Sequence, residues 1–322
     1  MSTRTITFKV FRFTAGRDYE PHYKTYAMEV SHDEVVLDVL NRIKWEHDGG
    51  FSYRRSCRHG ICGSCAIRVN NKTMIPCKEN VFQVADIFGD ELIIQPLNEK
   101  KAVKDLIIDK SDFWEKYEAV KPWLIAEIDE HPEKENYVDP EYVEALEEAD
   151  YCIQCGSCYY ICSALDVNEN YLGPAALAKA FRFTADIRDV AKEERLRGVN
   201  ELGSGIWDCV KCFECAEACP KGVDPIAKIT RLHNQTFEAG VHESNVATRH
   251  AYVFKKSIEK YGPLDEAENV RFSEGTLGAL KHMGVAFDML KAGKLPMPGR
   301  VHKSKNHDEI KKLVKIASKN KF

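Results

Sequence analysis

The chain is organised around the run Cys152-Ile-Gln-Cys155-Gly-Ser-Cys158-Tyr-Tyr-Ile-Cys162, whose pattern recurs as Cys209-Val-Lys-Cys212-Phe-Glu-Cys215-Ala-Glu-Ala-Cys219. Both runs have the spacing C-x2-C-x2-C-x3-C. This spacing is typical of iron–sulfur ligands, because a tight turn wraps three thiolates around one cluster and sends the fourth to a neighbouring cluster. Two matched copies therefore predict two adjacent cubane-type clusters.

Each run is expected to lend its last cysteine to the other cluster, as in two-cluster ferredoxins. The ligands of one [4Fe–4S] cluster are then predicted to be Cys152, Cys155, Cys158 and Cys219. The ligands of the other are predicted to be Cys162, Cys209, Cys212 and Cys215. Pro220 follows the second run as the pattern expects, whereas Ser163 follows the first, so a looser turn is expected there.

Four more cysteines near the N-terminus have a different spacing: Cys57, Cys62, Cys65 and Cys77. Three thiolates from one loop and a distant fourth form the plant-type pattern for a [2Fe–2S] cluster. Gly60 and Gly63 lie in this loop, where a chain that curls around a compact ion needs residues without a Cβ and with close backbone N–H donors. Arginines at positions 54, 55 and 58 either tune the cluster and dock a partner or are ordinary solvated side chains.

The segments around this loop predict a small mixed fold. Ile6, Phe8 and Val10 alternate with polar residues, and a second strand is expected over residues 24–30. Ser31-His-Asp-Glu34 is predicted to form a capping box before a helix with an apolar face at positions 36, 39, 40 and 43. Residues 65–69 and 73–77 are expected to pair across an Asn70-Asn71 turn, because asparagine tolerates positive φ.

Two other uses of twelve thiols compete with iron–sulfur clusters. Three zinc sites are disfavoured, because structural zinc sites usually pair two short C-x2-C units across a longer spacer. Disulfides are disfavoured because no secretory signal precedes the motifs and the spacing is that of chelation. Iron and labile sulfide in the purified protein, against zinc in a colourless one, separate these alternatives.

Bulk properties of the 322 residues narrow the possible functions. A formal net charge of −4 gives no indication of nucleic-acid binding. The N-terminus lacks the apolar core of a secretory signal, and no apolar run reaches the length that spans a bilayer. Membrane attachment is therefore expected to be peripheral or through a partner.

The region between the cysteine groups is acidic. Residues 127–150 contain eleven Asp or Glu and one Lys, with Pro132 and Pro140 as breakers, which predicts a solvent-facing connector. Further on, Gly173-Pro-Ala predicts the start of a helix, because proline suits the first turn.

The order of these motifs resembles that of the iron–sulfur subunits of succinate dehydrogenases and fumarate reductases. The resemblance runs from about residue 5 to residue 235 and includes Lys121-Pro-Trp-Leu and Cys219-Pro-Lys-Gly besides the cysteine loops. It implies an α+β chain with a β-grasp plant-type [2Fe–2S] ferredoxin domain at 1–105, an all-α two-cluster ferredoxin domain at 106–240 and a helical basic extension at 241–322. It also implies an electron-transfer subunit without substrate chemistry of its own, linking an FAD-containing succinate/fumarate flavoprotein to a membrane-side partner.

Three positions depart from most of this family. Many relatives lack a cysteine matching Cys212 and hold a [3Fe–4S] cluster, so a [4Fe–4S] cluster is expected here, with [3Fe–4S] as the alternative. Relatives that reduce quinone directly carry tryptophan and histidine where this chain has Val167 and Val210. These departures are similar to the methylmenaquinol:fumarate reductases, whose membrane-side partner is a cysteine-rich subunit like those of heterodisulfide reductase. A (methyl)menaquinone-type quinone would then be reached only indirectly.

Two further expectations concern context. The alternative function is a ferredoxin-like subunit of a heterodisulfide-reductase or glycolate-oxidase type flavoprotein complex, although such subunits generally lack the N-terminal plant-type domain. The expected location is the periphery of the cytoplasmic membrane, on the cytoplasmic face, or on the periplasmic face after co-export with a twin-arginine partner. From Lys291 to Phe322 there are ten Lys or Arg against two acidic residues, so this tail either meets an anionic surface or packs on its own domain.

Overall fold

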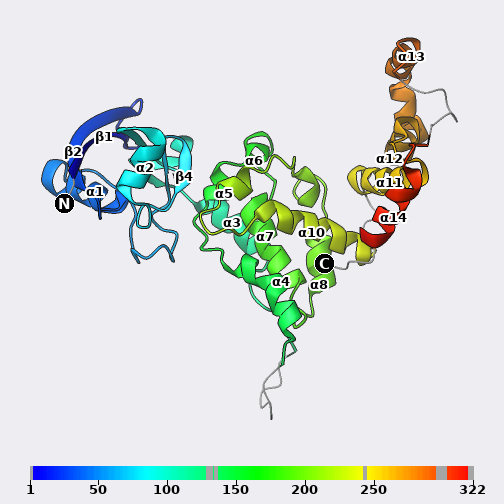
Figure 1. The fold of residues 1–322 in the computed structure, drawn as a ribbon, viewed down its shortest axis with the longest axis horizontal. Coiled ribbons are helices and arrows are strands. Elements are labelled where there is room, and N and C mark those ends of the chain that lie inside the picture. Colours follow the sequence, from blue (N-terminus) through cyan, green and yellow to red (C-terminus); the bar gives the residue numbers. More distant parts are fainter. Residues whose placement is uncertain (1–2, 128–132, 134–136, 242–244, 295–302, 318–322) are drawn as a thin grey trace. The chain divides into compact units, whose positions relative to one another are not determined.

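The computed structural model describes residues 3–127, 133, 137–241, 245–294 and 303–317 (Figure 1). The chain divides into two compact units. One unit contains residues 1–199 and 203–232, and the other contains residues 200–202 and 233–322. All twelve cysteines therefore belong to the first unit.

The N-terminal part of the first unit is a mixed five-stranded sheet with the order β2-β1-β5-β3-β4. Its strands are β1 (Thr3–Arg12), β2 (His22–Ser31), β3 (Ile67–Val69), β4 (Lys72–Met74) and β5 (Glu91–Gln95). β1 and β5 run parallel, and the other neighbours are antiparallel. Ile6, Phe8 and Val10 are fully buried, which confirms the predicted alternation in β1. The helices α1 (Val36–Arg42) and α2 (Val81–Phe88) contribute Val36, Val81 and their apolar neighbours to the same core.

The Asn70-Asn71 turn is confirmed. Asn70 has φ 48° and Asn71 has φ 65°, and Val69 pairs with Lys72 across them. Two successive residues with positive φ make the hairpin turn whose twist matches that of the flanking strands. The strands are shorter than predicted, so Cys65 and Cys77 lie just outside the paired residues.

The predicted capping box at Ser31 is wrong. Ser31 is the last residue of β2, where it pairs with Thr3, and α1 begins at Val36 after the N-cap residue Val35. The Glu34 carboxylate does accept a hydrogen bond from the Ser31 N–H at 2.8 Å, but this bond closes the turn between β2 and α1. Ser31 therefore belongs to the sheet, whereas the local sequence pattern had assigned it to the start of the helix.

The second half of this unit is helical apart from the small pair β6 (Ala102–Lys104) and β7 (Ile107–Ile108). Its helices are α3 (Ser111–Ala119), α4 (Pro140–Asp150), α5 (Ser157–Tyr160), α6 (Ser163–Val167), α7 (Gly173–Thr184), α8 (Lys192–Val199), α9 (Glu214–Glu217) and α10 (Pro225–Glu238), whose last residues enter the second unit. Pro174 lies in the first turn of α7, as predicted, and most residues of α7 are buried.

The C-terminal half of the predicted connector is solvent-facing over most of its side chains, but it also packs against the fold. Residues 140–150 form the amphipathic helix α4, in which Leu146 and Ala149 are buried. Two of its carboxylates hold other elements of the fold. Glu148 pairs with the fully buried Lys228, and Asp150 accepts a hydrogen bond from Arg182 at 2.7 Å. Much of the earlier part of the predicted connector, residues 128–132 and 134–136, lies outside the described residues.

The second unit contains α11 (Val246–Tyr261), α12 (Glu266–Lys281), α13 (Met283–Lys291) and α14 (His307–Ala317). α11 packs against both α12 and α14, and α12 has a non-helical residue at Gly275. In α14, Ile310 and Val314 are half-buried, whereas Leu313 is 65% exposed. The apolar side of α14 is therefore partly used for packing within the unit. Within the described residues, each helix is too short or too polar to cross a bilayer.

Candidate iron–sulfur sites

The N-terminal cysteines lie in a loop and hairpin that direct backbone N–H groups at their sulfurs. The N–H groups of residues 59, 61 and 62 each lie 3.4 Å from Sγ of Cys57. The Gly60 N–H reaches across to Sγ of Cys77 at 3.2 Å, which joins the loop to the hairpin. Gly60 and Gly63 have φ values of 66° and 67°, as expected for a curled loop. Such donors stabilise negative charge on cluster sulfurs, so this loop fits a [2Fe–2S] group.

The buried thiols of this group influence one another. The pKa of Cys65 is raised to about 12, mainly by burial and then by the neighbouring thiols of Cys77 and Cys62. Burial also acts to raise the pKa of Cys62, but hydrogen bonds from Ser64 and Cys57 to its sulfur outweigh burial and lower this pKa to about 6. Packing several thiols together is unfavourable for their charged forms unless a cation is shared among them.

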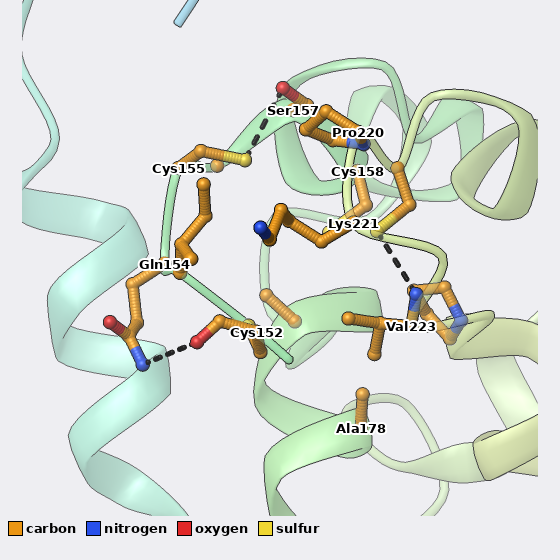
Figure 2. Close-up of a pocket in the computed structure, with 14 residues that line it drawn as sticks. Cys152, Gln154, Cys155, Ser157, Cys158, Ala178, Pro220, Lys221 and Val223 are labelled. Carbon is orange, nitrogen blue, oxygen red and sulfur yellow. Dashed lines mark hydrogen bonds between the residues drawn. The ribbon is translucent and has the colours of Figure 1, made fainter. Parts of the chain in front are cut away.

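The second cysteine group lines a cavity, which we call the second cavity. Its four cysteines are Cys152, Cys155, Cys158 and Cys219 (Figure 2). These are the residues predicted to share one cluster. The Val223 N–H donates to Sγ of Cys219 at 3.4 Å, and Sγ of Cys155 lies 3.4 Å from the Ser157 hydroxyl. Burial, followed by the other thiols, raises the pKa of Cys158 well above its ordinary value.

A third cavity is lined by the other predicted set, Cys162, Cys209, Cys212 and Cys215. Tyr171 forms part of its wall and is 1% exposed. Its pKa is raised, first by burial and then by the nearby thiols of Cys209 and Cys162. In contrast, Cys212 is exposed, and its Sγ lies 3.7 Å from the carboxylate of Glu214. This group therefore reaches the protein surface.

The two four-cysteine runs share one backbone conformation. Gln154 has φ 50° and Gly156 has φ 90° in the first run, and Lys211 (φ 55°) and Phe213 (φ 67°) occupy the same places in the second. The agreement supports an internal duplication of the loop. Phe213 stands where the first run has glycine, and a bulky residue in this region is strained by about 1–3 kcal/mol.

The first two cysteine groups are in direct contact. A Cβ added to Gly63 would lie 2.5 Å from the carbonyl oxygen of Ile153 and 2.9 Å from Cα of Cys155. Lys110 lies beside the same contact and donates to the carbonyl oxygens of Gln154 (3.1 Å) and Cys155 (3.0 Å). Burial lowers the pKa of Lys110, while the nearby Cys155 acts to raise it.

A further bond joins the hairpin to the second cavity. The buried hydroxyl of Thr73 in β4 donates to the carbonyl oxygen of Ala218 at 2.9 Å, next to Cys219. Sequence reasoning missed Thr73, Lys110 and Tyr171, because each acts on a segment remote in sequence. The one signal for Tyr171 was its place just before the Gly173-Pro174 helix start. Among the described residues, no three His, Cys, Asp or Glu side chains lie close enough together to hold a single metal ion; the four cysteines of the second and third groups are instead spread around their cavities.

Comparisons with known proteins agree with the two cysteine arrangements. The family model described as a 2Fe-2S iron-sulfur cluster binding domain matches residues 7–115. The model described as a 4Fe-4S dicluster domain matches residues 148–223. The chain thus has one [2Fe–2S] domain followed by one domain for two [4Fe–4S] clusters.

Several characterised proteins are similar over most of their length. The fumarate reductase iron–sulfur subunit of Haemophilus influenzae is 36% identical over 237 residues, covering 70% of this chain and 91% of the relative. The corresponding subunit of Mycobacterium tuberculosis is 35% identical, covering 70% and 90%. The mitochondrial succinate dehydrogenase iron–sulfur subunit 3 of Arabidopsis thaliana is 32% identical, covering 71% and 74%.

The fold is also similar to that of a solved structure. A chain of the Mycobacterium smegmatis Sdh1 complex in the apo form superposes with a TM-score of 0.61 at 22% identity, covering 73% of this chain and 98% of that one. Together with the sequence identities above, the cysteine cavities place the chain in a family: it belongs to the iron–sulfur subunits of fumarate reductases and succinate dehydrogenases.

Proposed function

We propose that this chain is the electron-transfer subunit of a quinol:fumarate reductase or succinate:quinone oxidoreductase. It conducts electrons between an FAD-containing flavoprotein subunit and a membrane-associated subunit, and it performs no substrate chemistry itself. The observation that carries this proposal is the succession of three four-cysteine groups within one unit, with the loop of the first touching the loop of the second at Gly63 and Cys155.

The proposed ligands follow from which sulfurs share a loop or cavity. The [2Fe–2S] ligands are Cys57, Cys62, Cys65 and Cys77. The ligands of the two [4Fe–4S] clusters are the four cysteines of the second cavity and the four of the third. When bound, these clusters supply one-electron acceptors and donors. The residues of the chain hold them close together, exclude water and direct N–H groups at their sulfurs.

The nuclearity of the third cluster depends on Cys212. Its thiol belongs to the third cavity, so a fourth ligand is available and a [4Fe–4S] cluster is favoured over a [3Fe–4S] cluster. Cys212→Ser is expected to give a [3Fe–4S] EPR signal in the oxidised protein that the wild type lacks. The same signal in the wild type would contradict the fourth-ligand assignment.

The surface around the third cavity supports docking of a protein partner. Val210 is 66% exposed, Phe213 58% and Val167 90%. The positive φ at Phe213 belongs to the loop conformation that both runs share, but the loop does not require a phenylalanine there, since the first run has Gly156; strained exposed residues are often retained for function. We assign this surface to a cysteine-rich, heterodisulfide-reductase-like membrane subunit, as in methylmenaquinol:fumarate reductases. A (methyl)menaquinone-type quinone is then reached through that subunit, because Val167 and Val210 offer no polar group to a quinone.

The finer assignments of fold and place belong to the same proposal. The parallel pair β1/β5 inside an otherwise antiparallel sheet supports a plant-type β-grasp domain over residues 1–105. The helical domain then covers 106–240 and the basic extension 241–322. The complex is peripheral to the cytoplasmic membrane, on its cytoplasmic face, or on the periplasmic face if a twin-arginine partner carries it across.

Purification of the tagged chain from its native membranes tests the function. Recovery with a flavin-containing subunit active on succinate or fumarate supports the proposal. Recovery with a flavoprotein of the heterodisulfide-reductase or glycolate-oxidase type, inactive on both acids, favours the alternative function. Cysteine analysis of the co-purified membrane-side subunit tests the proposed subclass.

A further inference from the structure

In the part of the chain that the structure describes, the end of α12 and all of α13 carry several exposed apolar side chains. We call residues 276–291 the apolar arm. Leu277 in the arm is 79% exposed, and Val285 and Phe287 are 62% and 59% exposed. No residue of α13 is buried. Contiguous exposed apolar surface on this scale is unusual unless something covers it, because each Å² costs about 25 cal/mol in water.

The arrangement of side chains on α13 suits a helix that lies flat in an interface. At 100° per residue, the apolar side chains from Met283 to Leu290 spread over roughly 200° of the helix. Gly284, Asp288 and Lys291 lie within the remaining roughly 160°, and Val285 and Phe287 lie at the two edges of the apolar arc. The nine residues extend about 13 Å, far less than the roughly 30 Å of a bilayer core. The helix therefore has the form of an interfacial element.

Charge and composition favour lipid over protein as the occupant. Lys281 precedes α13, and Lys291 and Lys294 close it, whereas Asp288 is the one acidic residue between positions 276 and 294. Anionic headgroups attract such lysines. The arm contains no Trp, Tyr or Arg, the residues that usually anchor protein interfaces. Its exposed side chains are Leu, Met, Val and Phe, which bury readily among acyl chains.

We propose that the apolar arm inserts into the boundary between headgroups and acyl chains of an anionic bilayer. Phe287, Val285 and Leu280 enter the apolar layer, and Lys281, Lys291 and Lys294 contact the lipid phosphates. This chain would then contribute a membrane contact of its own. The inference does not depend on the proposed electron transfer, because it rests on residues of the second unit that carry no cysteine.

Flotation of the full, cluster-loaded chain with lipid vesicles tests the proposal. Vesicles of phosphatidylcholine alone are compared with vesicles that also contain phosphatidylglycerol. The wild type is expected to bind the anionic vesicles. The double variant Val285→Glu/Phe287→Glu is expected to bind them at least about ten-fold more weakly. Ile87→Glu on α2, also an exposed apolar side chain at 69%, is the matched control and is expected to bind like the wild type.

A second variant tests the lysines. Lys281→Gln/Lys291→Gln/Lys294→Gln is expected to lose about five-fold per lysine on anionic vesicles and nothing on neutral ones. Circular dichroism and cluster absorbance verify that each variant is folded and loaded. The proposal is overturned if the wild type binds neither vesicle or if the double variant binds as well as the wild type. A protein partner would be favoured instead if the double variant kept its vesicle binding but no longer co-purified with another subunit in detergent.

Discussion

Gly63 and Cys155 touch across the junction between the first two cysteine groups, with no space for a methyl group between them. The contact joins a loop of the sheet domain to a loop of the helical domain. Gly63 also has φ 67°, so two requirements, conformation and space, coincide at this position. The closest approach of the two loops is therefore determined by the absence of a side chain.

Gly63→Ala is expected to separate these loops. The left-handed conformation alone costs alanine about 1–2 kcal/mol, and the contacts at 2.5 and 2.9 Å with backbone atoms force a shift as well. Gly16→Ala is the matched control, because Gly16 has φ 75° with no atom within 4 Å of an added Cβ. Urea unfolding should show the strain in both variants. Weakened magnetic coupling between the first two clusters, seen by EPR, should occur in Gly63→Ala alone, and equal coupling in both would contradict the proposed role of this contact.

Phe213 is expected to matter for docking and not for folding. Phe213→Gly relieves about 1–2 kcal/mol of strain but adds about 0.5–1 kcal/mol of chain entropy, so stability should change little. Binding of the membrane-side subunit, measured by co-purification yield, should fall. Ile61→Asn serves as the control, because Ile61 is exposed (67%) beside the first cysteine group and not the third. Loss of the membrane-side subunit in Ile61→Asn but not in Phe213→Gly would refute the assignment.

Tyr171 is expected to raise the reduction potential of the third cluster. The Tyr171 hydroxyl lies near the Cys209 sulfur, and a hydroxyl dipole beside a ligand sulfur can stabilise the reduced, more negative state. Tyr171→Phe removes this hydroxyl and keeps the ring that lines the cavity. A redox titration followed by EPR should show a lower midpoint potential for this cluster only. The other two clusters are internal controls, and a uniform shift of all three would indicate a general structural change instead.

Lowering the pH is expected to destabilise the helical domain, because Asp186 becomes protonated. Burial acts to raise the pKa of this carboxyl, but hydrogen bonds from Arg188 and Arg182 outweigh burial and hold the pKa well below its ordinary value. A depressed carboxyl pKa adds stability that is fully present above the unfolded pKa of about 3.9 and is lost as pH falls below it.

The comparison of wild type with Asp186→Asn measures this effect. Thermal unfolding should show a constant advantage for the wild type between about pH 7 and pH 5, shrinking as pH approaches about 4. Asp86→Asn, at an ion pair with Arg4 where the Asp86 side chain is 69% exposed, should change the stability little at any pH in this range. A stability advantage of the wild type over Asp186→Asn that grows as the pH falls would contradict the expected direction of the effect.

The features that sequence predicted are those with local causes. The Asn70-Asn71 turn follows from the tolerance of asparagine for positive φ, and Pro174 suits a helix start whatever surrounds it. Ser31 shows the limit, because its pairing with Thr3 depends on a strand nineteen residues or more away. The acidic connector shows the same limit: its charge composition predicted the solvent exposure that most of its side chains have, but not the ion pair between Glu148 and the distant, buried Lys228.

The site divides in a similar way. Cysteine spacing predicted which thiols line each cavity, since spacing determines how a short loop curls. Cysteine spacing does not predict which loops contact each other. Gly63, Lys110 and Tyr171 act on segments that are brought near only by the folded chain, and their residue types have many other uses.

The hydrogen bond from Thr73 to the carbonyl of Ala218 couples the unfolding of the two halves of the first unit. If β4 or the turn before Cys219 unfolds alone, a buried polar group in the other segment is left without its hydrogen-bond partner. Melting of the sheet would thus loosen the mouth of the second cavity at the same moment. Loss of structure in the [2Fe–2S] half is therefore expected to lower the stability of the neighbouring cluster site as well, by about the 1–3 kcal/mol that an unpaired buried carbonyl costs.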